Sequence, residues 1–178
     1  MPINFPACTG RLCTSQRLVQ AQTFSGAATF AHFRILALCT AGQDEGGRKF
    51  ETGSLVEHID FYIRLTQACR AEGYAVNRIM VNLTAFDERW QAKLNTHVLE
   101  ILATRYPTVD FAFDQTRETG RGYYYGAGFQ VNMTDPSGEV YFIADGGFTD
   151  WTQQYLSNRK ERLLISGFGS ERFVYVFG

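Results

Sequence analysis

The turn Asp135-Pro-Ser-Gly138 restricts the folds open to this 178-residue chain more than any other feature of its sequence. Proline at the second position and glycine at the fourth are typical of a type I turn. Strand-like segments lie on both sides of it, at residues 122–134 and 139–144, so the turn predicts an antiparallel β-hairpin. Fifteen Phe and nine Tyr also favour a sheet over an all-helical bundle.

Two amphipathic segments predict helices between the strands. Ser54-Leu-Val-Glu57 matches a capping box, and apolar residues follow it at helical spacing until Gly73. The second segment, about Asp87 to Arg105, ends before Pro107, because proline cannot continue a helix. We therefore expect two helices of several turns in a chain that also forms a sheet.

The remaining elements complete a mixed fold. Further strands are expected at Phe33–Cys39, Arg48–Thr52, Ile79–Leu83, Asp110–Phe113 and Leu163–Ser166, and a short helix around Asp150–Asn158. The run from Glu171 to Phe177 fits either a buried helix or a buried strand. The sequence thus predicts an α+β fold with an antiparallel β-sheet flanked by helices. We expect one domain over residues 1–178, with a poorly defined segment at 1–27.

Charge and composition exclude several classes of function. The formal net charge of −1 makes nucleic acid an unlikely partner in general, and no apolar run reaches the roughly 20 residues that span a bilayer. The first residues lack the basic start and apolar run of a signal peptide, so we expect a cytoplasmic protein. Its four scattered cysteines, Cys8, Cys13, Cys39 and Cys69, then read as free thiols, and no metal site is predicted.

Glycine, tyrosine and arginine concentrate in three segments, 120–130, 144–150 and 166–172. Glycine within a strand often marks close approach of a ligand, and tyrosine supplies a flat ring with a hydroxyl group. If residues 122–134 form a strand, Tyr123 and Tyr125 share one side while Tyr124 points to the other. The ligand-binding candidates are Tyr123, Tyr124, Gly126, Gly128, Gly146, Gly147, Asp150 and Gly169. Each segment alone also fits an ordinary structural role, as a hairpin over the core, a strand-to-helix turn or a strand turn.

In their order and spacing the three segments resemble the end of the class II catalytic core of histidyl-tRNA synthetase and of the ATP phosphoribosyltransferase regulatory subunit. The matching residues are Gly120, Tyr123, Tyr124 and Phe129 in the first segment, Gly146, Gly147 and Asp150 in the second, and Gly169, Glu171 and Arg172 in the third. The resemblance implies a class II aminoacyl-tRNA synthetase-like fold. It also implies that Tyr123 and Tyr124 lie on the amino-acid side of a ligand pocket.

The resemblance is weaker where the family binds phosphate. Thr119 takes the place of the family's catalytic arginine, although Arg121 lies close by, and Phe148 stands where the family has arginine. Residues 33–50 resemble the motif 2 hairpin, because Arg48-Lys-Phe50 resembles its closing residues. The candidate catalytic residues are Arg121 and Arg172, and the nucleotide-binding candidates are Arg34, Arg48 and Glu171.

Three hypotheses about function follow. The first is a degenerate synthetase-like domain that binds histidine or a similar amino acid and acts as a regulatory or sensor subunit. The second is a compact ligase that forms an aminoacyl- or acyl-adenylate; only this one requires ATP and Mg²⁺, and otherwise the cofactors are unknown. The third is an unrelated α+β protein-interaction module. Motif 1 is not recognisable, which would leave a sheet edge open, so we expect a homodimer or a hetero-complex.

Overall fold

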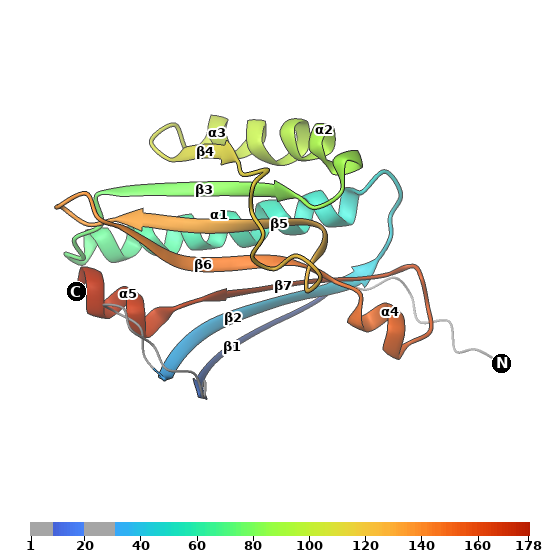
Figure 1. The fold of residues 1–178 in the computed structure, drawn as a ribbon, viewed down its shortest axis with the longest axis horizontal. Helices are drawn as coiled ribbons and strands as arrows, with labels where there is room; N and C mark the ends of the chain where they lie inside the picture. The colour runs from blue at the N-terminus through green and yellow to red at the C-terminus, as the bar shows by residue number, and fades with distance from the viewer. Residues whose placement is uncertain (1–8, 20–30) are drawn as a thin grey trace.

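Seven strands form one sheet in the computed structural model, which describes residues 9–19 and 31–178. The strands are β1 (Gly10–Val19), β2 (His32–Gln43), β3 (Arg78–Ala85), β4 (Asp110–Phe113), β5 (Tyr125–Thr134), β6 (Val140–Thr149) and β7 (Glu161–Phe168). Their order across the sheet is β1-β2-β7-β6-β5-β3-β4 (Figure 1). All neighbours are antiparallel except β3 and β4, so the sheet is mixed but mostly antiparallel. The predicted α+β class is confirmed.

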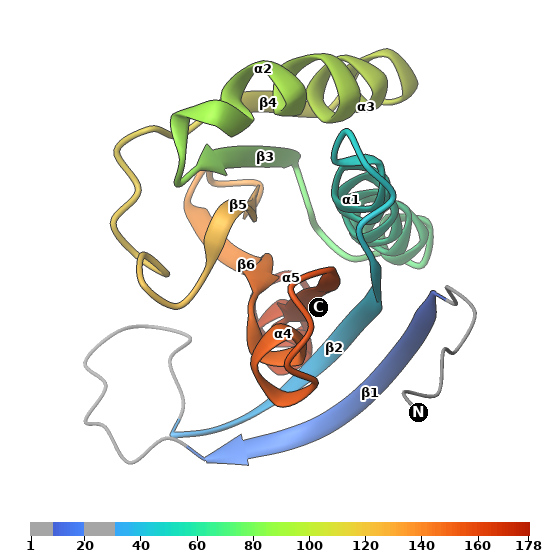
Figure 2. The same ribbon diagram turned by 90° about the vertical axis from the view of Figure 1, so that its right-hand side faces the viewer.

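Helices cover one face of this sheet. The long helix α1 (Lys49–Ala71) packs beside a continuous helical run at 88–105. That run contains a 3₁₀ turn (Glu88–Trp90), α2 (Gln91–Leu94), a π-helical turn (Asn95–Leu99) and α3 (Glu100–Arg105). Two short helices, α4 (Trp151–Tyr155) and α5 (Ser170–Phe177), flank β7 in the sequence. In Figure 2, α1 lies on one side of β5 and β6, and the connection from β4 to β5 lies on the other.

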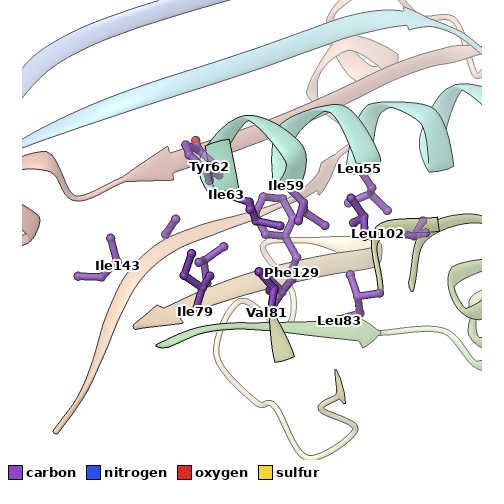
Figure 3. Close-up of a cluster of buried hydrophobic side chains, with 14 of the residues drawn as sticks. Leu55, Ile59, Tyr62, Ile63, Ile79, Val81, Leu83, Leu102, Phe129 and Ile143 are labelled. Atoms are coloured by element: carbon purple, nitrogen blue, oxygen red, sulfur yellow. The ribbon is translucent and has the colours of Figure 1, made fainter. Parts of the chain in front are cut away.

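The main core lies between α1 and the sheet (Figure 3). Ile59 and Ile63 of α1 meet Val81 and Phe129 of the strands, and each of these side chains has 0% of its surface exposed. Burying a side chain of this kind stabilises the fold by about 1.5–3 kcal/mol. Packing against α1 therefore covers this face of the sheet, so a binding site on the strands is to be sought on the opposite face.

Several sequence predictions are confirmed. The helical segment 87–105 and the strands at 79–83 and 110–113 form where the patterns place them. The turn also forms: the backbone N–H of Gly138 donates to the carbonyl oxygen of Asp135 at 3.1 Å and joins β5 to β6. The ambiguous final run is a helix, α5, which buries Phe173 and Phe177.

The region around position 50 contradicts the predictions. Residues 48–52 form no strand, because α1 begins at Lys49. The capping box at Ser54 is also wrong: Ser54 is buried in the second turn of α1, and Arg48 precedes the helix with a left-handed backbone φ of 64°. The expected hairpin over 33–50 does not form, because β2 pairs along its length with β1. Within the segment expected to be poorly defined, residues 10–19 thus form a strand, whereas 1–8 and 20–27 lie outside the described residues.

Two further boundaries differ from the predictions. β5 begins only at Tyr125, so Tyr123 and Tyr124 lie in a loop and do not alternate across a strand. Their rings meet edge to face, with centroids 4.8 Å apart. β6 continues past Ala144 to Thr149, which places Gly146 and Gly147 within the strand.

Candidate functional site

Strands β5, β6 and β7, which contain most of the glycines of the three segments, are neighbours in the sheet. Gly128 of β5 lies opposite Gly147 of β6, and Asp145 of β6 lies opposite Gly167 of β7. These residues share the face that points away from α1, since paired residues lie on the same side of a sheet. Gly146 faces the other way: a Cβ atom there would lie 2.6 Å from Phe129 in the core.

A loop of residues 114–124 crosses this open face (Figure 2). The ring of Tyr124 lies directly on Gly147, where a Cβ atom would come within 2.5 Å of its Cγ. A Cβ atom at Gly120 would also meet this ring, at 2.8 Å, and Phe86 stacks on it with centroids 6.4 Å apart. The missing glycine side chains therefore make the space that Tyr124 occupies.

An ion pair between a buried arginine and a partly exposed aspartate holds the loop on the sheet. The guanidinium of Arg117, whose side chain is 1% exposed, donates to Asp145 at 2.7 Å. It also donates to the carbonyl oxygens of Thr119 at 2.8 Å and Phe129 at 3.2 Å. Burial raises the pKa of Asp145, and the charge of Arg117 opposes this rise. Neither residue is marked by a sequence pattern, because no pattern shows which arginine of the segment turns inward.

A cavity of about 300 Å³ opens beside this pair, and we name it the tyrosine cavity. Its lining residues are Ile35, Ala37 and Cys39 of β2, Asp145 of β6, Ile165, Ser166 and Gly167 of β7, and the aromatic side chains of Tyr123, Tyr124 and Trp151. The rings of Tyr123 and Trp151 meet edge to face, with their centroids 5.7 Å apart. Burial raises the pKa of Tyr124, which keeps its hydroxyl group neutral. The cavity thus combines an apolar floor, aromatic walls and one carboxylate.

A buried hydrogen-bond network lies behind the cavity floor. Ser166, which lines the cavity, is 2.8 Å from His58 Nδ1 and 2.8 Å from the hydroxyl of Tyr62. The other ring nitrogen of His58 is 2.8 Å from the hydroxyl of Thr40. Burial lowers the pKa of His58 to about 4, so its ring is neutral near pH 7. This network fixes the position of Ser166 in the sheet.

A second, larger hollow of about 670 Å³ lies near the start of α1 and of β5. We name it the arginine hollow. It is lined by Arg48, Arg89, Arg121, Arg159 and Arg162, by Glu51 and Asp87, by Phe86, Trp90, Tyr124 and Tyr125, and by Gly122, Gly126 and Gln153. Gly126 has a φ of 70° and lies so close to Trp90 that a Cβ atom would be 2.6 Å from its ring. Two candidate arginines, Arg48 and Arg121, are therefore brought together here.

The other candidates lie elsewhere. Arg34 is exposed on β2, on the opposite side of the strand from the cavity-lining Ile35. Arg172 donates to the carbonyl oxygen of Phe142 at 3.1 Å, near the far end of β6 from the arginine hollow. Tyr125, which lines the arginine hollow, pairs with Phe148 of β6. Phe142 is six residues from Phe148, a separation of ~20 Å along the strand. Arg172 and Arg121 therefore do not converge.

Three more candidates have identifiable positions. Glu171 lies 3.7 Å from Arg17 of β1 in an ion pair. The N–H of Gly169 donates to the carbonyl oxygen of Ile143 at 2.8 Å, just before α5 begins. Asp150 precedes α4 with an exposed side chain and makes no capping hydrogen bond. None of the three lines the tyrosine cavity among the residues that the structure describes.

Two searches of the described ranges, 9–19 and 31–178, are negative. No group of three or more His, Cys, Asp or Glu residues there is arranged to hold a metal ion. No helix in those ranges is long and apolar enough to cross a membrane.

Solved structures of synthetase-related proteins share this fold. The apo histidyl-tRNA synthetase from S. aureus superposes with a TM-score of 0.65 at 11% identity, over 93% of this chain and 43% of that one. An ATP phosphoribosyltransferase regulatory subunit/histidyl-tRNA synthetase from Bacillus halodurans gives 0.56 at 12%, over 96% and 59%. The ATP phosphoribosyl transferase (HisG:HisZ) complex from Thermotoga maritima gives 0.53 at 11%, over 92% and 74%.

These likenesses confirm the class II aminoacyl-tRNA synthetase-like fold. The chain spans less than half the length of the S. aureus synthetase. No model of a protein family matches the sequence, and no curated protein matches it either. The fold is therefore established by three-dimensional similarity, and the roles of individual residues must be argued from this chain itself.

Proposed function

We propose that the tyrosine cavity binds a small amino acid-like ligand, histidine or one similar to it, and that the protein acts as a regulatory or sensor subunit in the cytoplasm. The carboxylate of Asp145 is suited to a ligand ammonium group, and such a cation would favour the ionised carboxylate against the effect of burial. Ile35 and Ile165 supply an apolar floor, and the rings of Tyr123 and Trp151 would flank a flat side chain.

The charge balance of the cavity supports binding without activation. Among the described residues that line it there is no arginine, and the adjoining Arg117 spends its donors on Asp145 and two backbone carbonyls. Adenylate formation develops negative charge on the α-phosphate, and losing one preorganised donor commonly costs about 10²- to 10³-fold in rate. This observation carries the proposal. Asp145 can hold an amine in the cavity, but none of the described lining residues supplies a cation for a reacting phosphate.

The ligase hypothesis needs Arg121 and Arg172 on one phosphate, and their separation speaks against it. The interaction-module hypothesis is also weaker, because the glycine-rich strands run side by side. Amino acid-dependent exchange of pyrophosphate into ATP would restore the ligase hypothesis.

A partner chain is part of the proposal. Among the described strands β1 is an edge of the sheet with side chains that are nearly all exposed, and none of these strands pairs with its outer backbone groups, which a partner could therefore meet. One solved structure with this fold is a complex by its name, the ATP phosphoribosyl transferase (HisG:HisZ) complex. A homodimer or a hetero-complex is the expected assembly, and the net charge of −1 gives no reason to expect a nucleic acid.

Calorimetry with each of the twenty amino acids tests the proposal. We expect one of them, or a few of similar shape, to bind, and Asp145→Asn to weaken that binding about tenfold or more, as expected for a lost charged hydrogen bond. Asp150→Asn, which removes a carboxylate outside the cavity, is the matched control and should bind normally. Because Asp145 also stabilises the loop, Ala37→Phe provides a second variant that fills the cavity floor. Absence of binding by all twenty at millimolar concentration would overturn the proposal.

A further inference from the structure

We propose that the arginine hollow is a second ligand site, which binds a small phosphorylated molecule with a flat ring and a hydrogen-bond donor, the chemistry of a mononucleotide. This inference does not depend on what the tyrosine cavity binds, because the two spaces have different linings and, of the described residues, share just Tyr124. The argument rests on the charges of the hollow, on one buried acceptor atom and on its aromatic walls.

Three of the five arginines have guanidinium groups free to meet an anion. Arg48 lies over the ring of Trp90 at 3.9 Å, and no carboxylate of the described residues forms an ion pair with it. The side chain of Arg159 forms no ion pair within the same described ranges. Arg121 pairs at 3.3 Å only with Glu118, whose side chain is 80% exposed and contributes little.

The other two arginines are neutralised by the carboxylates of the hollow. Arg89 makes a two-pronged contact with Asp87, including 3.0 Å from Nε to Oδ1. Arg162 donates to Glu51 at 2.9 Å and to Asp44 at 2.8 Å. Five arginines but only two of the described acids line the hollow, while Asp44 and Glu118 pair with Arg162 and Arg121 from outside the lining, so the positive charges still outnumber the negative ones. Guanidinium groups bind carboxylate and phosphate oxygens in a forked geometry, and a phosphate, with its higher charge and three free oxygens, can meet several of these arginines at once.

Glu51 provides an observation that is independent of the arginine charges. Its side chain is only 5% exposed, and while Oε1 accepts from Arg162, Oε2 is buried without a hydrogen-bond partner among the residues that the structure describes. An unsatisfied buried acceptor costs about 1–3 kcal/mol, and for a charged group more. Glu51 forms part of the wall of the hollow, so an N–H or O–H group of a bound molecule would satisfy this oxygen after a small rotation of the carboxylate toward the hollow. Inorganic phosphate brings no donor other than its own hydroxyl groups, whereas a nucleotide also brings the N–H and O–H donors of its base and ribose.

Aromatic rings complete the site. Tyr125 and the stacked pair Phe86 and Tyr124 are each partly exposed and line the hollow. Flat apolar faces of this kind stack well against a base, at about 1–3 kcal/mol per base. The volume of about 670 Å³ is typical of a small-molecule pocket, which favours one nucleotide over a polymer. The available arginines thus match the phosphate of a nucleotide, the aromatic rings match its base, and Glu51 matches one of its hydrogen-bond donors.

The tryptophans allow the two sites to be read separately. The chain has only two, of which Trp90 lines the arginine hollow and Trp151 lines the tyrosine cavity. In the Trp151→Phe variant, titration with AMP should change Trp90 fluorescence and reach saturation at millimolar concentration or below. Adenosine and inorganic phosphate, the two halves of the probe, should each compete with AMP and bind at least about tenfold more weakly, because each satisfies fewer groups.

Two variants and a control decide the result. Arg159→Ala should weaken AMP binding about tenfold or more, as for the loss of a charged contact. Glu51→Gln should weaken AMP and adenosine but leave phosphate unchanged. Arg64→Ala, an exposed arginine of α1 outside the hollow, should bind AMP normally.

Three outcomes would overturn the proposal: no saturable change with AMP, equal effects of Arg159→Ala and Arg64→Ala, or a single-stranded oligonucleotide that binds far more tightly than AMP. If Glu51→Gln does not fold, the comparison of Arg159→Ala with Arg64→Ala still decides. Amino-acid binding by the tyrosine cavity, read from Trp151, should survive Arg159→Ala in either case.

Discussion

The tyrosine cavity and the arginine hollow treat charge in opposite ways. Among the described residues that line the tyrosine cavity, the single carboxylate is that of Asp145, which already has the enclosed guanidinium of Arg117 beside it. In the arginine hollow, three guanidiniums have little or no acidic partner and a buried carboxylate oxygen lacks a donor. In the first region Arg117 is used to hold the loop, whereas Asp145 keeps 31% of its side chain exposed and lines the cavity. In the second region three guanidinium groups remain available, as the proposed ligand site requires. A basic residue near a pocket is thus a candidate for binding only when the fold leaves it unpaired.

The difference follows from how each region is built. The tyrosine cavity stands on neighbouring strands of the sheet, where the missing side chain of Gly147 lets Tyr124 lie flat on the backbone. The arginine hollow is assembled near the beginnings of α1 and β5 and beside α4, so its long side chains reach into open space. Strand packing demands paired charges, whereas element ends tolerate unpaired ones in contact with water.

The largest expected effect separates two arginines of the loop that spans both regions. Arg117→Met should lower the free energy of unfolding by about 3 kcal/mol, because it leaves Asp145 without its buried partner. Arg121→Met, four residues later, should change it by less than about 0.5 kcal/mol, because its ion pair is exposed. Urea denaturation at pH 7 measures both. Equal decreases in the free energy of unfolding would mean that Arg117 and Arg121 do not differ in their structural roles.

The second prediction concerns the network behind the tyrosine cavity. The pKa of His58 is about 4 in the folded chain against 6.5 for an unperturbed histidine, so between these values the unfolded chain takes up a proton that the folded chain does not. Stability is therefore fully present above about pH 6.5 and decreases as the pH falls toward 4. At pH 4.5 the loss from this group should be about 2–3 kcal/mol.

His58→Gln tests this origin of the pH dependence. The variant should be less stable than the parent at pH 7, because the contacts with Thr40 and Ser166 are altered. Its stability should then decrease less between pH 7 and 4.5 than that of the parent, since no imidazole is left to titrate. The measurement is urea denaturation at several pH values. Parallel pH profiles for the two chains would show that other groups cause the acid sensitivity.

The sequence predicted the parts of the fold that depend on local rules. The type I turn at 135–138 and the helical run at 87–105 follow from residue preferences within a few positions of each other. The error at Lys49 has a tertiary cause. Phe50 packs against Gly42, where a Cβ atom would come within 2.5 Å of its ring, and Glu51 bonds to Arg162 from β7. These long-range contacts start α1 five residues before the capping box that local rules selected.

The candidate site was harder to predict than the fold. The glycine-rich segments correctly indicated adjacent elements, because glycine marks close approach on a strand. Which arginine turns inward depends on packing between segments that are far apart in the sequence: Arg117 meets Asp145, 28 residues away. The arginine hollow combines Arg48, Arg121 and Arg159 from three distant segments, and no motif contains all three.

The smallest expected effect distinguishes the two adjacent glycines of β6, one on each face of the sheet. Gly146→Ala should cost about 2 kcal/mol, because its new methyl group would lie 2.6 Å from both Phe129 and Ser166 in a packed core. Gly147→Ala should cost only about 1 kcal/mol, since the loop that holds Tyr124 can move away. The movement matters for function: Tyr124 lines both cavities, so Gly147→Ala should weaken binding of histidine or of AMP, whichever the wild-type chain binds. At a low temperature at which the variant is folded, Gly146→Ala should bind the same ligand as the wild-type chain with unchanged affinity. If Gly146→Ala instead loses binding and Gly147→Ala keeps it, the open face of the sheet is not the face that binds ligand.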